Sequence, residues 1–574
     1  MPKLCHPEYD AEYHGSRSRH VCDFRQIHLA ISGTSDGDIL IHVPIRVVFA
    51  FVCRANRIAR LVAALACVGL AAACSPSDRP TEAAEGPVAC KDLAAFPVPE
   101  TTIESADVVA AGTFQPPVPQ PPFFQADYST LPAFCRVTGS IKPTPDSDIR
   151  FELWLPGENW NGKFMQTGNG GAAGLIVYSS LADNLGRGYA VANTDTGHQG
   201  SMGDFSWAAG HREKLIDFEY RAVHALTVVG KTLTAAHYGR VPDKSYMVGC
   251  STGGHQGLME AQRYPDDYDA ILAGAPAINM SSLSALSTLI PLNLGPAGLR
   301  FNKLGLLQEA AIAACDANDG VKDRVITEPA RCDFDPAALK CKSGETGQCL
   351  SANEVAAARR IYAGVVDKDG NVLYPGTGPG GEAAWASYSS PQFDIGTSYY
   401  RYVVMNDPDW DPATFDVDAD LARARKVDLG VHATMDPGLS KFVAHGGKLL
   451  TYHGTTDGLI PYRSSVNYYE SVVETLGADV VKDSVKFYLV PGMNHCFGGT
   501  GAYVVDWLAA LEQWAEQDET PGTLLGTHPA NMPGAPTIMP DKMFTRPICP
   551  YPQVPRYKGS GDDTDAANFE CAAP

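Results

Sequence analysis

The stretch around Ser251 constrains the fold of this chain more than any other part of the sequence. A short apolar run at residues 245–248 leads through a G-x-S-x-G motif at residues 249–253 directly into a helical pattern. Such a strand–turn–helix unit aims the serine at the edge of a sheet, and its small neighbours permit a strained turn. The following helix begins with backbone N–H groups that can stabilise negative charge. Ser251 is therefore the predicted nucleophile.

The five-residue motif alone is weak evidence. It also occurs at residues 33–37, where no helical pattern follows, and we interpret that copy as coincidence. The alternative for residues 249–253 is a glycine-rich turn without a catalytic role. The strand and helix patterns on either side favour the catalytic interpretation.

Short apolar segments alternate with helical patterns along much of the chain. The predicted strands are residues 150–155, 163–166, 189–193, 245–248, 270–273, 448–452 and 486–490. A helical pattern at residues 217–237 separates the third from the fourth. This alternation predicts an α/β protein with a mostly parallel sheet that is covered by helices on both faces.

The alternation stops at residues 277–435. This segment holds four cysteines, many Gly and Pro residues and several acidic clusters. We interpret it as a second domain that is inserted into the first. The first domain then consists of residues 90–276 and 436–574.

A nucleophilic serine requires a base and an orienting acid, which on such a sheet follow in the order Ser, Asp, His. Asp457 and His495 each come just after a predicted strand, where parallel sheets collect reactive groups. They are the predicted acid and base. His453 is the alternative base, but it precedes the acid and lies closer to the strand end. We interpret His453 as a residue that lines the substrate pocket.

The N-terminal region has the layout of an export signal. Three arginines precede an apolar run at residues 61–73, which ends in small residues before Cys74. We interpret residues 54–74 as a signal peptide of the bacterial lipoprotein type, with a lipid attached to Cys74. Ordinary cleavage nearby and a short buried helix are the alternatives.

The segments on either side of this signal have no periodic pattern. Residues 1–53 are interpreted as a mis-annotated extension before the true start of translation. Residues 75–89, rich in Ser, Pro, Glu and Ala, are interpreted as a tether. The expected location is therefore the periplasm, the outer membrane through a lipid anchor, or the medium.

Charge and hydropathy exclude two classes of protein. The chain carries 45 Lys and Arg against 65 Asp and Glu, a net charge of −20, and has no basic block. A nucleic-acid-binding protein that relies on a basic patch is therefore not expected. No apolar run reaches the roughly 18 residues that a membrane-spanning helix needs. Any membrane attachment would depend on the lipid at Cys74.

Ten of the 15 cysteines follow the predicted leader. An even number in an exported chain predicts disulfides, and the absence of a C-x-x-C pair disfavours a zinc ribbon or a redox motif. Cys250 directly precedes Ser251, and Cys496 directly follows His495. If the serine and the histidine meet, these two cysteines are brought together as well. We therefore predict a disulfide between them.

The Gly-Cys-Ser-Thr-Gly-Gly stretch, the distal Asp457 and the Asn-His-Cys stretch together resemble the tannase and feruloyl esterase family of α/β-hydrolases. The resemblance covers about residues 90–574. It implies an α/β-hydrolase fold with a large lid domain between the catalytic Ser and Asp, in agreement with the interruption at residues 277–435. It also implies an oxyanion hole formed by the N–H groups of Gly170 and Thr252.

The same resemblance implies a full set of disulfides. In addition to Cys250–Cys496, the implied pairs are Cys90–Cys135, Cys315–Cys332, Cys341–Cys349 and Cys549–Cys571.

An acidic cluster at residues 316–325 places three carboxylates around a glycine turn. By itself the cluster fits either a solvated turn or a calcium loop, since calcium prefers six to eight oxygen ligands. The resemblance implies a structural Ca²⁺ in the lid, with ligands from the side chains of Asp316, Asp319 and Asp323 and the carbonyl groups of Val321 and Val325. No organic cofactor is expected, because acyl transfer through a serine requires none.

The predicted reaction is hydrolysis of a carboxylic ester through an acyl-enzyme on Ser251. The resemblance implies small esters of aromatic acids as substrates, with polysaccharide or polyphenol as candidate carriers. A feruloyl esterase is the first choice. A tannase acting on galloyl esters and a mono(2-hydroxyethyl) terephthalate hydrolase are the alternatives.

Two further residues are candidates for the substrate pocket. Arg401 lies in an aromatic stretch at residues 397–410, where it would pair with a substrate carboxylate or with Asp407. Ile460 would form an apolar wall near the acid.

Two other classes of function remain as hypotheses. A non-catalytic surface lipoprotein could bind aromatic ligands on the same scaffold, but the intact Ser, Asp and His argue against it. A metalloenzyme with calcium at the reaction centre is disfavoured, because the acidic cluster is far from Ser251 in sequence.

Overall fold

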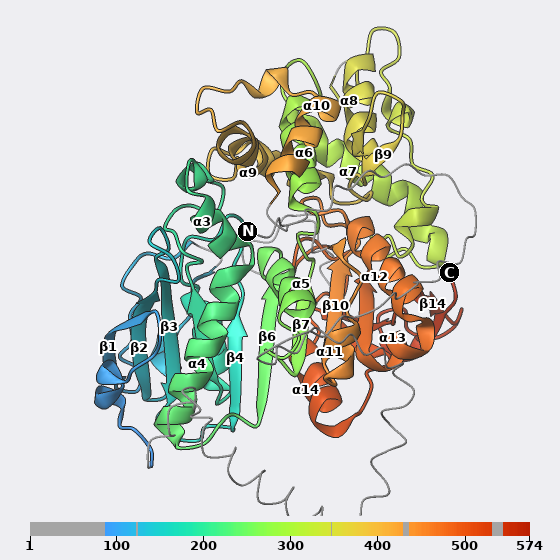
Figure 1. Cartoon of the computed structure of the whole chain (residues 1–574). Coiled ribbons are helices and arrows are strands. Elements are labelled where there is room, and N and C mark those ends of the chain that lie inside the picture. Colours follow the sequence, from blue (N-terminus) through green and yellow to red (C-terminus); the bar gives the residue numbers. More distant parts are fainter. Residues whose placement is uncertain (1–85, 122–123, 346, 429–434, 531–542) are drawn as a thin grey trace, which may run out of the picture. The chain divides into compact units, whose positions relative to one another are not determined.

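The computed structural model describes residues 86–121, 124–345, 347–428, 435–530 and 543–574, which belong to one compact unit that spans residues 83–574 (Figure 1). The predicted N-terminal extension, the signal peptide and Cys74 lie outside the described residues. Val88, which the sequence assigns to the tether, donates its N–H to Ala236 O at 2.9 Å, so the packed chain begins before residue 90. No helix in the described ranges is both long and apolar enough to span a membrane.

A nine-stranded sheet forms the centre of this unit, in the order β1-β2-β3-β5-β4-β6-β7-β10-β11. Six neighbouring strands are parallel: β5 (Ala190–Thr194), β4 (Lys163–Thr167), β6 (Lys244–Cys250), β7 (Ala270–Gly274), β10 (Lys448–Gly454) and β11 (Val485–Val490). Antiparallel strands extend one edge: β1 (Thr101–Val109), β2 (Phe134–Ile141) and β3 (Ile149–Pro156). All seven predicted strands are present, so the mostly parallel α/β arrangement is confirmed. The prediction lacks β1 and β2.

Helices cover both faces of the sheet. One face packs against α4 (Ala222–Tyr238), α5 (Thr252–Arg263), α11 (Ser440–Ala444) and α12 (Tyr462–Leu476). The other face packs against α2 (Tyr178–Gly186) and α14 (Trp507–Gln517). Successive residues of β6 point to opposite faces. Met247 packs against the face that is covered by α4 and α5, and Tyr246 packs against the face that is covered by α2 and α14. Strands that are buried on both faces in this way have nearly continuous apolar sequences.

The segment between β7 and β10 is mainly helical. Its elements are α6 (Met280–Leu292), α7 (Leu304–Cys315), α8 (Ala352–Ala363), α9 (Ile395–Ser398), α10 (Val417–Val427) and the strands β8 (Val365–Val366) and β9 (Val372–Tyr374). Its helices lie beyond the ends of the sheet strands (Figure 1). The hydroxyl of Tyr388 donates a hydrogen bond of 2.5 Å to Leu459 O, in the loop after β10. The segment therefore contacts the loop that carries Asp457.

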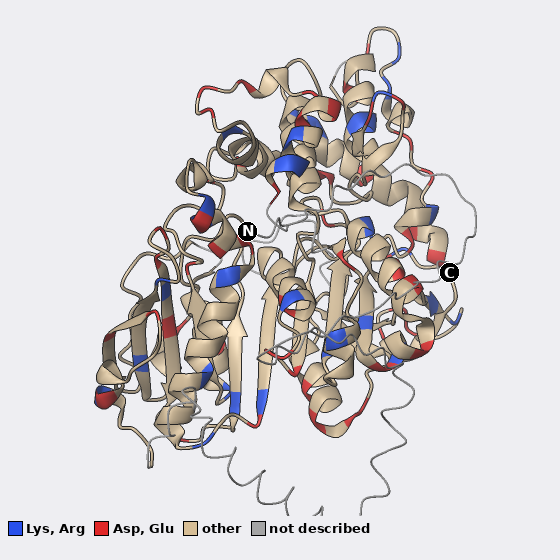
Figure 2. Ribbon diagram, viewed as in Figure 1, with Lys and Arg blue, Asp and Glu red and all other residues tan. Residues whose placement is uncertain are grey.

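The C-terminal part of the chain adds α13 (Ala478–Ser484) before β11 and two small antiparallel sheets after α14. These pair β12 (Leu524–His528) with β13 (Phe544–Ile548), and β14 (Val554–Tyr557) with β15 (Phe569–Ala572). All five predicted disulfides are present: Cys90–Cys135, Cys250–Cys496, Cys315–Cys332, Cys341–Cys349 and Cys549–Cys571. Lys and Arg are scattered over the elements and interleaved with Asp and Glu (Figure 2).

Candidate active site

Ser251 occupies the sharp turn between β6 and α5. Its backbone has φ 65° and ψ −123°, a conformation that is strained for any residue except glycine. Backbone hydrogen bonds hold the turn, because Ser251 N–H donates to Gly274 O at 2.9 Å and Ser251 O accepts from His255 N–H at 3.0 Å. A Cβ on Gly249 would lie 2.5 Å from Gly253, which explains why both flanking positions are glycine. The geometry is that of the predicted nucleophile turn.

Asp457 lies in the loop after β10 and is fully buried. Its Oδ2 is 2.7 Å from His495 Nδ1, and its Oδ1 accepts hydrogen bonds of 2.9 Å from the N–H groups of Leu459 and Ile460. Burial alone would raise the pKa of Asp457, but the charge of His495 and the hydrogen bonds from His453 and His495 outweigh it, so the pKa lies far below its ordinary value. The structure therefore holds an ionised carboxylate against His495.

His453 does not line a pocket, and that prediction is wrong. Its side chain is completely buried, with Nε2 at 3.2 Å from Asp457 Oδ2 and 2.9 Å from Ile460 O. Nδ1 lies 2.8 Å from Ser465 Oγ. Because both neighbours of Nε2 are acceptors, we assign the proton to Nε2, with Nδ1 accepting from the serine hydroxyl. His453 therefore holds the carboxylate of Asp457 in position through a buried hydrogen bond.

Ile460 contributes to the site mainly through its backbone. Its N–H donates to Asp457 and its carbonyl accepts from His453, while its side chain, 4% exposed, packs into the hydrophobic cluster of the inserted segment. The prediction of an apolar wall does not include this backbone role.

His495 is positioned to act as a base. Its side chain is 21% exposed, and because Asp457 engages Nδ1, Nε2 remains free to accept a proton. The disulfide between Cys250 and Cys496, with a Cα–Cα distance of 6.0 Å, joins the residue before Ser251 to the residue after His495. The described contacts include no hydrogen bond from the Ser251 hydroxyl to His495, as is common in ligand-free sites. Their juxtaposition rests on this disulfide.

Removing the Cys250–Cys496 disulfide is expected to destabilise the protein. We expect the double variant Cys250→Ser/Cys496→Ser to lose about 2–5 kcal/mol of unfolding free energy, because the bond closes a loop of 246 residues in the unfolded chain. Denaturant titration under non-reducing conditions measures this loss. Cys341→Ser/Cys349→Ser, which opens a loop of 8 residues, is the matched control and should lose less. A double variant at 250 and 496 as stable as wild type would contradict the prediction.

The loop after β4 is fastened to the first turn of α5. Gly253 N–H donates to Asn169 O at 2.8 Å, and Thr252 Oγ1 donates to Gly171 O at 2.6 Å. The Gln256 side chain adds two hydrogen bonds to Asn169. Its Oε1 accepts from the Asn169 N–H at 3.0 Å, and its Nε2 donates to Asn169 Oδ1 at 3.1 Å. Sequence reasoning missed Gln256; its place in the helix directly after Ser251 is the signal that could have found it.

Two backbone N–H groups next to the nucleophile have no acceptor among the described residues. In the described part of the chain, neither Gly170 N–H nor Thr252 N–H donates a hydrogen bond to another protein group. Gly170 belongs to the loop and Thr252 begins α5, directly after the nucleophile. Free N–H groups at these two positions are suited to bind a developing oxyanion.

The carboxylates of the predicted calcium loop accept hydrogen bonds from the backbone of the same loop. Asp316 Oδ1 accepts from Arg324 N–H at 2.7 Å, and Asp319 Oδ1 accepts from Val321 N–H at 3.0 Å. Burial raises the pKa of Asp316 and Asp319, and the charge of Asp323 adds to this effect. A cation would relieve the repulsion between these groups, so the residues fit Ca²⁺ in charge and chemistry.

An arginine already neutralises part of the negative charge of this loop. The buried guanidinium of Arg546 lies 2.5 Å from Asp323 Oδ2. A cavity of about 10 Å³ lies beside the loop and is lined by residues that include Asp319, Val325, Thr327 and Arg546.

Arg401 lies in a π-helical turn, Tyr399–Met405, within the inserted segment. Its guanidinium approaches Trp410 O, with both nitrogens at 3.4 Å. Asp407 contacts Arg401 through the backbone, as its N–H donates to Arg401 O at 3.0 Å. The predicted side-chain pair of Arg401 with Asp407 is not among the ion pairs of the described residues.

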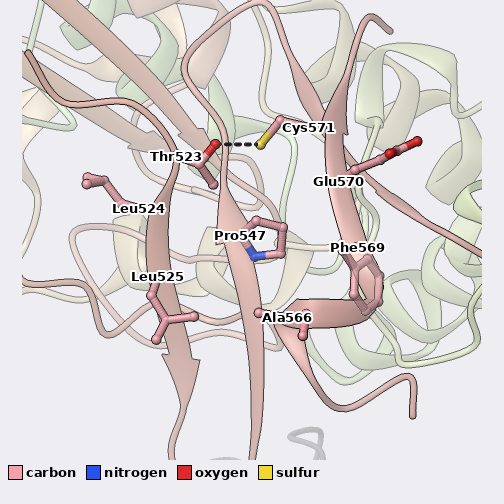
Figure 3. A pocket seen from close by; sticks show the side chains of 9 residues that line it. Thr523, Leu524, Leu525, Pro547, Ala566, Phe569, Glu570 and Cys571 are labelled. Carbon is pink, nitrogen blue, oxygen red and sulfur yellow. Dashed lines mark hydrogen bonds between the residues drawn. The ribbon is translucent and has the colours of Figure 1, made fainter. Parts of the chain in front are cut away.

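A surface hollow of about 380 Å³ lies at the C-terminal strands, and none of the predicted catalytic residues lines it (Figure 3). Its walls are residues of β12, β13 and β15, including Leu524, Leu525, Pro547 and Phe569. Thr523 Oγ1 lies 3.3 Å from Cys571 Sγ at one end. We assign no catalytic role to this hollow.

The chain is similar in sequence to known proteins along most of its length. The model of the family described as tannase and feruloyl esterase matches residues 135–572. A protein described as probable feruloyl esterase B-2 of Aspergillus terreus is 36% identical over 498 residues, which cover 83% of this chain and 93% of that protein. An uncharacterized esterase of Xanthomonas campestris is 34% identical over 549 residues, covering 85% of this chain and 92% of that protein.

Solved structures agree with the fold. Feruloyl esterase B from Aspergillus oryzae matches with a TM-score of 0.76 and 32% identity, over 83% of this chain and 98% of that chain. Tannin acyl hydrolase from Aspergillus niger matches with a TM-score of 0.69 over 87% of this chain and 97% of that chain; at 24% identity this likeness supports the fold alone. The predicted α/β-hydrolase fold is confirmed.

Proposed function

Because the chain belongs to the tannase and feruloyl esterase family and is a carboxylic ester hydrolase, we propose that it cleaves esters of aromatic acids through an acyl-enzyme on Ser251. The observation that carries this proposal is the pairing of Asp457 with His495 at 2.7 Å, next to the disulfide that joins the serine and histidine loops. Asp457 is ionised and fully buried, which suits it to fix the imidazole tautomer.

The first half of the proposed reaction transfers the acyl group to the enzyme. His495 Nε2 accepts the hydroxyl proton of Ser251 while the serine oxygen attacks the ester carbonyl. The N–H groups of Gly170 and Thr252 bind the oxyanion of the tetrahedral intermediate. When the intermediate collapses, His495 returns the proton to the departing alcohol and Ser251 carries the acyl ester.

The second half repeats these steps with water. His495 removes a proton from the water that attacks the acyl-enzyme, and the oxyanion is again held by the two backbone donors. The proton then passes to the serine oxygen, which releases the acid.

Aromatic and apolar side chains next to the oxyanion loop support an aromatic acyl group. A Cβ placed on Gly170 would lie 3.6 Å from both the Phe124 ring carbon Cζ and Met202 Sδ. Both side chains are half-buried, and aromatic rings and thioethers both pack favourably against aromatic groups. We propose ferulate as the preferred acid because several relatives are described as feruloyl esterases. Galloyl esters and a terephthalate monoester are the alternatives, and in the last case Arg401 would bind the free carboxylate.

A turnover panel tests the substrate proposal. Purified mature protein is assayed with methyl ferulate, methyl gallate and mono(2-hydroxyethyl) terephthalate, and kcat/KM is compared. We expect methyl ferulate to give the highest value. A preference for the gallate or the terephthalate ester would transfer the assignment to that alternative. Failure to cleave any of the three by a folded protein would contradict the aromatic-ester proposal.

We also propose that Asp316, Asp319 and Asp323, with the carbonyl groups of Val321 and Val325, bind a structural Ca²⁺. The ion would stabilise the inserted segment, where the disulfide Cys315–Cys332 lies beside the loop, and would take no part in the chemistry.

Calcium removal is expected to lower the melting temperature before it abolishes catalysis. After EDTA treatment and buffer exchange, Tm should fall by several degrees, because the half-buried carboxylates of Asp316 and Asp319 lose their counter-charge. Re-addition of Ca²⁺ alone should restore Tm in wild type and not in Asp316→Asn. Activity that disappears at temperatures where the metal-free protein is still folded would contradict a purely structural role.

Export of the chain is also part of the proposal. The five disulfides support a location outside the cytoplasm. Periplasmic, lipid-anchored and released forms are distinguished by the mass of the mature N-terminus, which carries acyl chains only if Cys74 is lipidated.

A further inference from the structure

A cluster of three metal-ligating side chains lies between α4 and α5, away from the triad. His224 comes from α4, Glu260 from the C-terminal half of α5 and Asp267 from the turn before β7. One ligand atom from each of them lies within 4.8 Å of the others. Glu260 follows Ser251 by nine residues along the helix, a distance of roughly 13 Å. The cluster is therefore separate from the proposed esterase site.

The buried carboxylate of Glu260 is the unusual member of this cluster. Its side chain is 0% exposed, and within the described residues no N–H or O–H group donates to either of its oxygens. A carboxylate oxygen of Asp267 lies within 4.8 Å of it. Buried carboxylates without a partner are costly and rare, so this position calls for a compensating positive group.

Lys231 is the positively charged residue next to this cluster, but it forms no hydrogen bond with Glu260. The ammonium group of Lys231 donates to the backbone carbonyl of Asp267 and lies 5.5 Å from the ring centroid of Tyr268. It contributes charge to the cluster without a hydrogen bond to Glu260. His224 Nδ1 lies 2.6 Å from Asp267 Oδ2, and its ring stacks on Tyr264 at 3.7 Å. His224 and Asp267 are thus held in place, and both face the unpaired acid.

We propose that His224, Glu260 and Asp267 bind a divalent cation of the zinc type that fastens α4 to α5. One imidazole nitrogen and two carboxylates form a donor set that zinc accepts, with water completing a tetrahedral site. Ligand atoms at zinc bond lengths are roughly 3.4 Å apart. Zinc binding would therefore replace the hydrogen bond between His224 and Asp267, whose atoms lie 2.6 Å apart, and draw Glu260 toward them. The site is reachable, because the side chains of His224 and Asp267 are 33% and 16% exposed.

Zinc titration of the mature protein tests this site. The protein is stripped with EDTA, exchanged into buffer with excess Ca²⁺ to fill the calcium loop, and titrated with Zn²⁺ alone by calorimetry and by thermal melting. We expect one zinc site in wild type and a rise in Tm of about 3 °C when free zinc is about 100-fold above Kd. Glu260→Gln and His224→Asn should each weaken zinc binding by at least about 100-fold, since even outer-shell partners of metal ligands cost 10- to 100-fold.

The neighbouring pair of His445 and Asp266 provides a matched control. His445 Nδ1 lies 3.3 Å from Asp266 Oδ1, but both side chains are exposed. His445→Asn should keep the full zinc response. The half-exposed His224 is replaced as well as Glu260, so that one variant folds even if the buried substitution fails. The proposal is overturned if zinc leaves the wild-type Tm unchanged, or if the response survives in His224→Asn. Esterase activity plays no part in this readout, so the proposed function stands or falls separately.

Discussion

Ser251→Ala is expected to reduce kcat for ester hydrolysis by about 10⁶-fold, because the reaction then lacks the atom that carries the acyl group. The remaining oxyanion donors and the substrate pocket would leave a small residual rate above that in water. The measurement is kcat with methyl ferulate on freshly purified protein. Tm should stay within a few degrees of wild type, since a half-buried hydroxyl is removed without opening a cavity. Turnover at the wild-type rate would contradict the assignment of Ser251.

Asp457→Asn is expected to lower kcat by about 10⁴-fold while the protein stays folded. The amide can donate a hydrogen bond where the carboxylate only accepts, so His495 would be held in the wrong tautomer, with its proton on Nε2. The buried bonds from Leu459 and Ile460 would keep the side chain in place. The effect should appear in kcat and less in KM.

A matched substitution on the surface controls for this result. Asp479 lies in α13 with its side chain 97% exposed, and Asp479→Asn should leave kcat within about two-fold of wild type. If Asp457→Asn lost no more activity than Asp479→Asn, Asp457 would not be the orienting acid.

The parallel strands could be predicted from the sequence because they are buried on both faces. The residues of β5 and β7, for example, are all buried, and β7 is a short continuous apolar sequence. The edge strand β1 has no comparable signal, since all but one of its residues are partly or fully exposed and polar residues interrupt the run. Its pairing with β2 is decided by tertiary contacts rather than by a local pattern.

The catalytic residues could be predicted because each one follows a strand that the sequence marks clearly. The sequence does not indicate in the same way how deeply the side chains near the end of a strand are buried. His453 and Asp457 are four residues apart at the end of β10, and only the packing against α12, through Ser465, places His453 behind the acid. The backbone bonds of Ile460 to both residues depend on the turn of this loop. Asp457 favours such a turn, but the bond from Ile460 to His453 appears only in the folded chain.

Mass spectrometry of the protein after reaction with a fluorophosphonate examines the active site most directly. This reagent reacts with a serine only where a base activates the hydroxyl and donors stabilise the anion. We expect one adduct per chain on the peptide that contains Ser251, and a strongly slowed reaction in His495→Ala. Labelling of a different serine, or undiminished labelling of Ser251 in His495→Ala, would contradict a catalytic triad of Ser251, His495 and Asp457.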